Sequence, residues 1–173
     1  MFETADELAE LDDLLGASLA RSNDHLRSII TPGERTLNAV QLAAVLIGIS
    51  HLTVATVTAT GEPRVSAVDG HFLHGRFVFS TTSQAAKIRH LRARPAVSAS
   101  HLRGDALGVF VHGTADIIGK GDTDGTRLDG YLTSIYGVSP YTFGDEIVFV
   151  RIQPVWMVAY AFRPDDLLRS LDR

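Results

Sequence analysis

Four hydroxyl side chains in a row, Ser80 to Ser83, stand between an apolar stretch and a predicted helix. The apolar residues 77–79 indicate a strand, and Lys87 falls in the second turn of the helix. Ser83 and Lys87 are four residues apart, so both can face the same side of the helix start. A helix start also presents backbone N–H groups that have no partner within the helix, and these favour anions. The pattern therefore predicts a phosphate-binding corner, with Ser80, Thr81, Thr82 and Lys87 as candidate ligands.

The same residues also have a plainer interpretation. Lys87 can be a solvated lysine on a helix surface. The hydroxyl run can be a strand exit followed by an N-cap, where Ser and Thr are common. The residues on their own leave both interpretations open.

The elements around this corner are mostly strands. Stretches rich in β-branched and apolar residues, punctuated by Gly, Pro and Asp, predict strands at 51–60, 64–68, 76–80, 96–102, 106–118, 147–152 and 155–162, the last two separated by Pro154. Helical periodicity and caps predict helices at 5–21, 37–47, 83–94 and 123–136, with a loop at 22–35 and a short or frayed helix at 164–173. Strands outnumber helices and their connections are short. This predicts a mainly β fold, a β-barrel with helices packed outside it.

Composition narrows the class of protein. A chain of 173 residues with 45% hydrophobic residues predicts one domain with a core of ordinary size. There is no cysteine, which excludes disulfides and thiolate chemistry. The acidic start and the lack of a long apolar run predict a cytoplasmic protein without a membrane partner. The net charge of −4 argues against nucleic acid as a partner.

Other clusters of polar residues in the sequence do not indicate a functional site. The seven histidines are scattered and show no recognised zinc spacing, so no metal site is predicted. The basic run from Lys87 to Arg94 lacks interleaved aromatic residues and indicates a solvated helix face. The acidic pairs 12–13 and 165–166 are neighbours in sequence, and their side chains point to different sides of a helix.

Several segments, taken in order, resemble the FMN-binding split-barrel family. This family includes the pyridoxamine 5′-phosphate oxidase-like proteins and the deazaflavin-dependent oxidoreductases. The matching segments are residues 52–57, 61–66, 77–81, 86–98 and 111–115, and residues 152–156 look like the closing strand of the family. The resemblance implies a six-stranded Greek-key split barrel that forms a homodimer, with cofactor sites in the clefts between subunits. The domain plan is then an N-terminal extension at 1–35, the barrel at 36–163 and a tail at 164–173.

The resemblance also implies roles for particular residues. Lys87 stands where the family places a cation on the cofactor phosphate, and Ser80, Thr81 and Thr82 stand where it places hydroxyl and backbone donors. The strand segment Arg64, Val65 and Ser66 would edge the ring of the cofactor. Trp156 would approach the cofactor from the other subunit. Ala85 departs from the pattern, because close deazaflavin-binding relatives often carry a second basic residue there.

The function implied is that of an oxidoreductase with a flavin-type cofactor, either deazaflavin coenzyme F-420 or FMN, which exchanges a hydride with a small-molecule substrate. F-420 is favoured because the spacing from Ser80 to Lys87 looks like that subgroup and the chain is short. The cofactor would carry the chemistry, so no residue is predicted to be catalytic. The alternatives are a non-catalytic carrier or sensor of flavin, deazaflavin or haem, and a purely structural dimeric domain.

Overall fold

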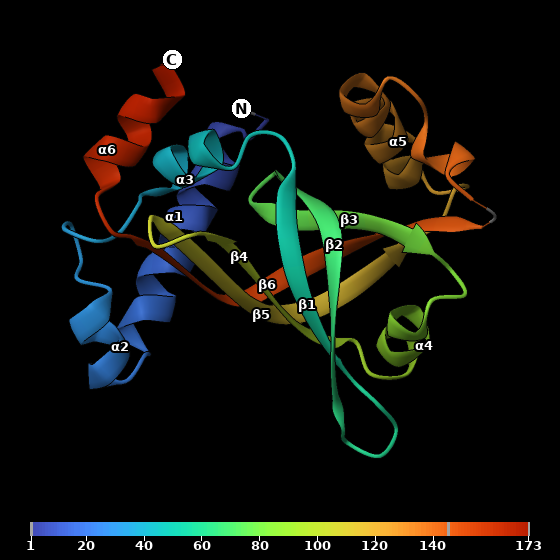
Figure 1. The fold of residues 1–173 in the computed structure, drawn as a ribbon, viewed down its shortest axis with the longest axis horizontal. Coiled ribbons are helices and arrows are strands. Elements are labelled where there is room, and N and C mark those ends of the chain that lie inside the picture. Colours follow the sequence, from blue (N-terminus) through green and yellow to red (C-terminus); the bar gives the residue numbers. More distant parts are fainter. Residues whose placement is uncertain (1, 145, 173) are drawn as a thin grey trace.

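Six antiparallel strands close into a barrel in the order β1-β2-β3-β6-β5-β4 in the computed structural model, which describes residues 2–144 and 146–172 (Figure 1). The strands are β1 Ser50–Val57, β2 Pro63–Leu73, β3 Arg76–Thr82, β4 Ala96–Arg103, β5 Leu107–Ile118 and β6 Ile147–Ala161. This confirms the predicted mainly β class and the six-stranded barrel.

The barrel interior is a filled hydrophobic core. Alternation along the strands supplies it: in β1, Leu52 and Val54 are buried while Thr53 between them is exposed. Phe77 and Phe79 of β3 fill the same space and are 0% exposed. The interior is therefore occupied by side chains, and any ligand must bind on the outside or at an end of the barrel.

Helices cover parts of the outside. They are α1 Ala5–Ala20, α2 Asp24–Ile29, α3 Ala39–Val45, α4 Ala86–Ala93, α5 Thr123–Tyr136 and α6 Pro164–Arg169, with short 3-10 helices η1 Pro140–Thr142 and η2 Ser170–Asp172. In Figure 1, α1, α2, α3 and α6 gather on one side of the barrel, and α4 and α5 lie on the other. None of the helices in the described ranges has the length and apolar character that a bilayer crossing needs.

The predicted break of the last strand at Pro154 is wrong. β6 runs without interruption from Ile147 to Ala161, and its pairing with β5 shifts register between His112 and Gly113. His112 pairs with Trp156 and Gly113 with Pro154, so Val155 is the extra residue of a β-bulge. The bulge accommodates a proline that cannot donate a ladder hydrogen bond.

Three other boundaries also differ from the prediction. The stretch Asp69-Gly70 was expected to be a connection but lies inside β2, because Asp69 pairs with His51 and Gly70 with Ser50 of β1. The predicted loop at 22–35 contains α2, whose N-cap Asn23 accepts a hydrogen bond from the Leu26 amide at 2.8 Å. The helix predicted at 83–94 begins only at Ala86.

Candidate cofactor site

The barrel splits where β2 and β3 part. Their pairing ends at Gly70 and Phe79. From there β2 continues paired with β1 alone, and β3 continues through Thr82 paired with β6. Figure 1 shows the two strands diverging, with α4 following β3 on this side of the molecule.

Core packing and a contact with β1 hold α4 in a fixed position. Ile88 and Leu91 of α4 are 0% and 1% exposed and belong to the main core. His90 Nδ1 lies 2.9 Å from the hydroxyl of Thr56 on β1. Two apolar anchors and one polar contact therefore fix the direction in which the first turn of α4 points.

The first turn of α4 offers donors for an anion. Ala85 is its N-cap and has no side chain that could accept the orphan amides of Ala86 and Lys87. The Lys87 side chain is half-buried and forms no hydrogen bond or ion pair with any residue the structure describes. An ammonium group and two backbone amides are thus available at one place.

The hydroxyl side chains of Ser80 to Ser83 do not point to one side. Ser80, Thr81 and Thr82 lie on β3 opposite Phe149, Val148 and Ile147, so they alternate between the two faces of the sheet. Thr81 shares the inward face with Phe79, whereas Ser80 and Thr82 point to the other face. Ser83 precedes the helix, and the expectation that it shares a helix face with Lys87 is therefore wrong.

A carboxylate that sequence reasoning missed stands beside this corner. Ser83 Oγ donates to Glu146 Oε2 at 2.6 Å, and Gln84 Nε2 donates to the same oxygen at 3.0 Å. These two hydrogen bonds lower the pKa of Glu146, which stays ionised. No pattern in the sequence could have linked Glu146 to Ser83, because the contact joins residues 63 positions apart.

The β2 residues also alternate. Arg64 and Ser66 pair with Thr56 and Val54, whose side chains are buried, so they lie on the face of β2 that turns toward the core and α4. Val65 lies on the opposite, outer face and is 67% exposed. Arg64 Nη2 forms an ion pair with Glu62 at 2.8 Å, with both side chains exposed. Arg64 and Ser66 therefore share a face with Thr56, which contacts His90 of α4, and Val65 does not.

Trp156 lies on the outer face of the barrel. The pairing places Val65, Ala55, Ser98, His112 and Trp156 in one row across five strands. The Trp156 ring stacks on His112 with centroids 4.7 Å apart, and its Nε1 donates to the Ser18 carbonyl of α1 at 3.1 Å. His112 Nδ1 in turn lies 2.8 Å from Ser98 Oγ.

Within one chain, Trp156 contacts α1, which lies on the opposite side of the barrel from α4 and its Lys87 (Figure 1). His112 is a further exposed polar residue in the row that sequence reasoning missed. Its position in a strand was predicted, but its neighbours depend on the strand order, which periodicity does not reveal.

A closed six-stranded barrel, two neighbouring strands that part, and a helix start beside the opening together define a split barrel. The family model described as pyridoxamine 5′-phosphate oxidase matches residues 40–139, more than half of the chain. The chain belongs to this family.

Solved structures share the fold. A conserved hypothetical protein from Mycobacterium tuberculosis aligns with a TM-score of 0.65 and 19% identity over 78% of this chain and 91% of its own. An F-420 reductase aligns at 0.53 and 24% identity over 66% and 93%. A FAD-binding protein from Mesorhizobium loti aligns at 0.57 and 20% identity over 73% and 94%. The search of curated proteins found no match.

Proposed function

We propose that this chain is an oxidoreductase that binds a flavin-type cofactor, with coenzyme F-420 favoured and FMN next, and exchanges a hydride with a small organic substrate. The observation that carries the proposal is the first turn of α4 beside the split of the barrel, where Lys87 and two backbone amides have no partner among the residues that the structure describes. Family membership supports a flavin-type cofactor. The fold shared with an F-420 reductase and a FAD-binding protein supports both cofactor classes.

The residues fit a phosphate. An ammonium and helix-start amides form charge-assisted hydrogen bonds with an anion. The carboxylate of Glu146 already accepts from Ser83 and Gln84, so in this proposal the phosphate binds on the Lys87 side of the turn. Arg64 and Ser66 lie on the same face of β2 and would line the path of the ring. Ser80, Thr81 and Thr82 would then contribute singly, chiefly Thr81 through its inward side chain.

The cofactor, when bound, would supply the hydride chemistry. The chain would hold the phosphate, orient the ring along β2 and leave one ring face open to a substrate. This division of labour requires no acid–base pair in the protein.

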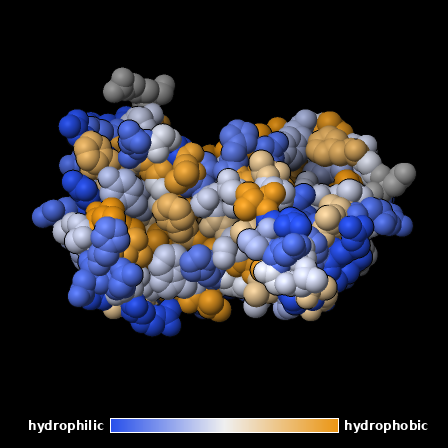
Figure 2. All heavy atoms as spheres, turned by 60° about the horizontal axis from the view of Figure 1, so that its bottom comes forward, coloured by the Kyte–Doolittle hydropathy of each residue, from blue (hydrophilic) through white to orange (hydrophobic). Residues whose placement is uncertain are grey.

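We also propose that a second copy of the chain completes the site. Trp156 lies on the outer face, away from Lys87, so it reaches a cofactor only across a subunit contact. The outer face of the sheet carries exposed apolar side chains, including Val65, Leu102 and Phe110, which are 67%, 59% and 38% exposed. Figure 2 shows apolar atoms gathered in its left half, on the α2 side of the molecule.

A binding titration tests the cofactor assignment. Purified protein is titrated with F-420 and, separately, with FMN while fluorescence and absorbance are followed. Lys87→Gln is expected to weaken the binding by about 1.5–3 kcal/mol, the scale of a hydrogen bond to a charged group. Lys120→Gln is the matched control, since Lys120 is the other lysine in the sequence and lies over the Tyr141 ring.

The outcomes separate the alternatives. Saturable binding of one cofactor that Lys87→Gln weakens and Lys120→Gln does not supports the site. Binding of neither cofactor overturns the proposal, and a Soret band on adding haem would point to the carrier alternative. If the reduced cofactor is bound but passes its hydride to acceptors no faster than it does free in solution, the protein is a carrier and not an enzyme.

A further inference from the structure

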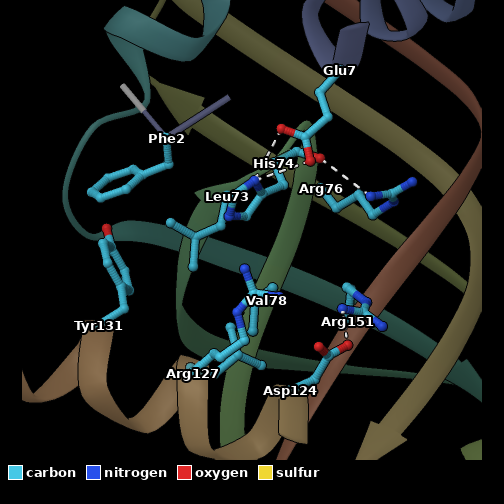
Figure 3. A pocket seen from close by; sticks show the side chains of 11 residues that line it. Phe2, Glu7, Leu73, His74, Arg76, Val78, Asp124, Arg127, Tyr131 and Arg151 are labelled. Carbon is cyan, nitrogen blue, oxygen red and sulfur yellow. Dashed lines mark hydrogen bonds and ion pairs between the residues drawn. The ribbon is translucent and has the colours of Figure 1, made fainter. Parts of the chain in front are cut away.

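A cavity of about 280 Å³ lies between the start of α1, the β2–β3 hairpin and α5. Figure 3 shows its lining residues, among them Leu73, Val78 and Arg127. The eight predicted cofactor residues are absent from this lining, so the cavity is distinct from the split. We propose that it binds a small aromatic monocarboxylate, a function beyond the cofactor site.

The acidic groups of the cavity already have partners. The Glu7 carboxylate accepts from the Thr4 amide at 2.8 Å and lies 3.0 Å from His74 Nδ1. Asp124 accepts from Arg151 Nη1 at 2.7 Å. These interactions lower the pKa of both carboxyl groups, which are ionised and engaged at neutral pH.

Two arginines of the lining have N–H donors without a partner among the described residues. Arg127 forms no hydrogen bond or ion pair within the part of the chain that the structure describes, and in Figure 3 its side chain reaches from α5 into the middle of the cavity. The Nε of Arg151 is buried and also lacks a partner among the described residues. Arg151 is matched by two carboxylates, since its guanidinium also lies 3.6 Å from Asp116. Arg127 lowers the pKa of Asp124 by its charge but forms no ion pair with it or with any other described residue. The unmatched group is therefore a cation, and an anion is the ligand that would match it.

The rest of the lining is apolar and partly aromatic. Leu73 and Val78 are 4% and 1% exposed and form the floor. Leu128 and Tyr131 of α5 form a wall, and the Tyr131 ring meets Phe2 edge to face with centroids 4.6 Å apart. A flat ring packs well on such surfaces.

The size of the cavity limits the ligand. A volume of about 280 Å³ corresponds to roughly nine waters at about 30 Å³ each. One ring with a carboxylate fits into that space, whereas a flavin-type cofactor with its ribityl phosphate does not. The cavity is also preformed, because the capping box of α1 fixes Glu7 and the His74 turn adopts φ +53° beside it.

Isothermal titration calorimetry with benzoate and benzamide tests the proposal. Benzoate has about nine heavy atoms, for which a Kd between micromolar and millimolar is expected. Arg127→Gln is expected to weaken benzoate binding tenfold or more, and benzamide is expected to bind the wild-type protein at least tenfold more weakly than benzoate. Lys87→Gln serves as the matched control, since it removes a cation from the cofactor corner only.

Three results would overturn the assignment: no saturable benzoate binding up to about 10 mM, equal binding of benzamide, or loss of benzoate binding in Lys87→Gln instead of Arg127→Gln. Near-ultraviolet circular dichroism verifies that each variant keeps its fold. Arg127→Lys provides a second variant, which retains the charge without the planar fork and is expected to bind benzoate with intermediate affinity. Lys87→Gln leaves benzoate binding intact even if the cofactor proposal fails, so the two proposals can be judged separately.

Discussion

At the residue scale, the cofactor corner contains one cation and one carboxylate that differ in their partners. Lys87 is half-buried and has no hydrogen-bond or ion-pair partner within residues 2–144 and 146–172, and Glu146 accepts from Ser83 and Gln84 on the neighbouring loop. No described residue neutralises the charge of Lys87, whereas the Ser83 hydroxyl already donates a hydrogen bond to Glu146. The position of Lys87 at the start of a helix could be predicted because its spacing from the strand end is local. The sequence could not predict the partner of Ser83, because that contact depends on how β3 and β6 pair.

A second feature at the residue scale is the buried side chain of His71, which makes the stability of the protein depend on pH. Its side chain is 1% exposed, its Nε2 lies 2.8 Å from the Tyr136 hydroxyl, and burial lowers its pKa. The unfolded chain therefore takes up a proton on this histidine at a higher pH than the folded protein does. The contribution to stability is complete above the unfolded pKa of about 6.5 and is lost as the pH falls below it. One extra proton bound by the unfolded state lowers the free energy of unfolding by about 1.4 kcal/mol for each pH unit of acidification.

We expect His71→Gln to flatten this dependence. In urea unfolding at about pH 7.5 and pH 5.5, the loss of unfolding free energy on acidification should be smaller in the variant by about 1–2 kcal/mol. At the higher pH the variant should be less stable by about 1–3 kcal/mol, because a buried hydrogen bond is disturbed. Some dependence should remain, since burial also lowers the pKa of His101. His25→Gln on the exposed face of α2 should behave like wild type, and an unchanged slope in His71→Gln would refute the assignment.

At the scale of elements, the sequence predicts the existence of strands and helices better than their limits. The helix Thr123–Tyr136 matches the prediction to the residue, and Gly137 ends it with φ +75°. Asp122 stands at its N-cap, but its carboxylate accepts from the Gly119 amide and does not cap the helix. The hydroxyls Ser80 to Thr82 remain in a strand because they pair with β6, a tertiary contact that overrides local preference. The continuity of β6 through Pro154 likewise depends on β5 and its glycine.

The prediction at this scale concerns Gly113 of β5, which lies at the bulge. A Cβ on Gly113 would lie 2.0 Å from the Gln153 carbonyl oxygen, which is backbone and cannot rotate away. We expect Gly113→Ala to destabilise the protein by about 3 kcal/mol or more, because the bulge must open. Gly130→Ala on α5 is the control, where an added Cβ meets nothing within 4 Å and a gain of about 0.5–1 kcal/mol is expected. Thermal unfolding measures both, and equal midpoints for the two variants would contradict the close approach.

At the scale of the whole molecule, one side of the barrel presents exposed apolar residues beside α2. A groove on this side is lined mainly by apolar residues of α2, β4, β5 and β6, including Ile29, Leu102 and Phe110. The row from Val65 to Trp156 crosses the same outer face of the sheet. Burying this surface against a second copy would bring Trp156 of one subunit toward the split of the other. Such an arrangement would explain why the predicted cofactor residues fall on two faces of a single chain.

Phe110→Asp tests this arrangement. Phe110 points outward from β5 and is 38% exposed, so a charge there should leave the fold intact but oppose burial against a second copy. We expect sedimentation to give a dimer dissociation constant at least tenfold larger in the variant than in wild type. If the site spans two subunits, the cofactor affinity should fall as well. Ile47→Asp, a change at a 56% exposed residue outside the sheet, should alter neither quantity. If wild type sediments as a single chain at all concentrations yet binds cofactor, the site is complete within one subunit and Trp156 has no part in it.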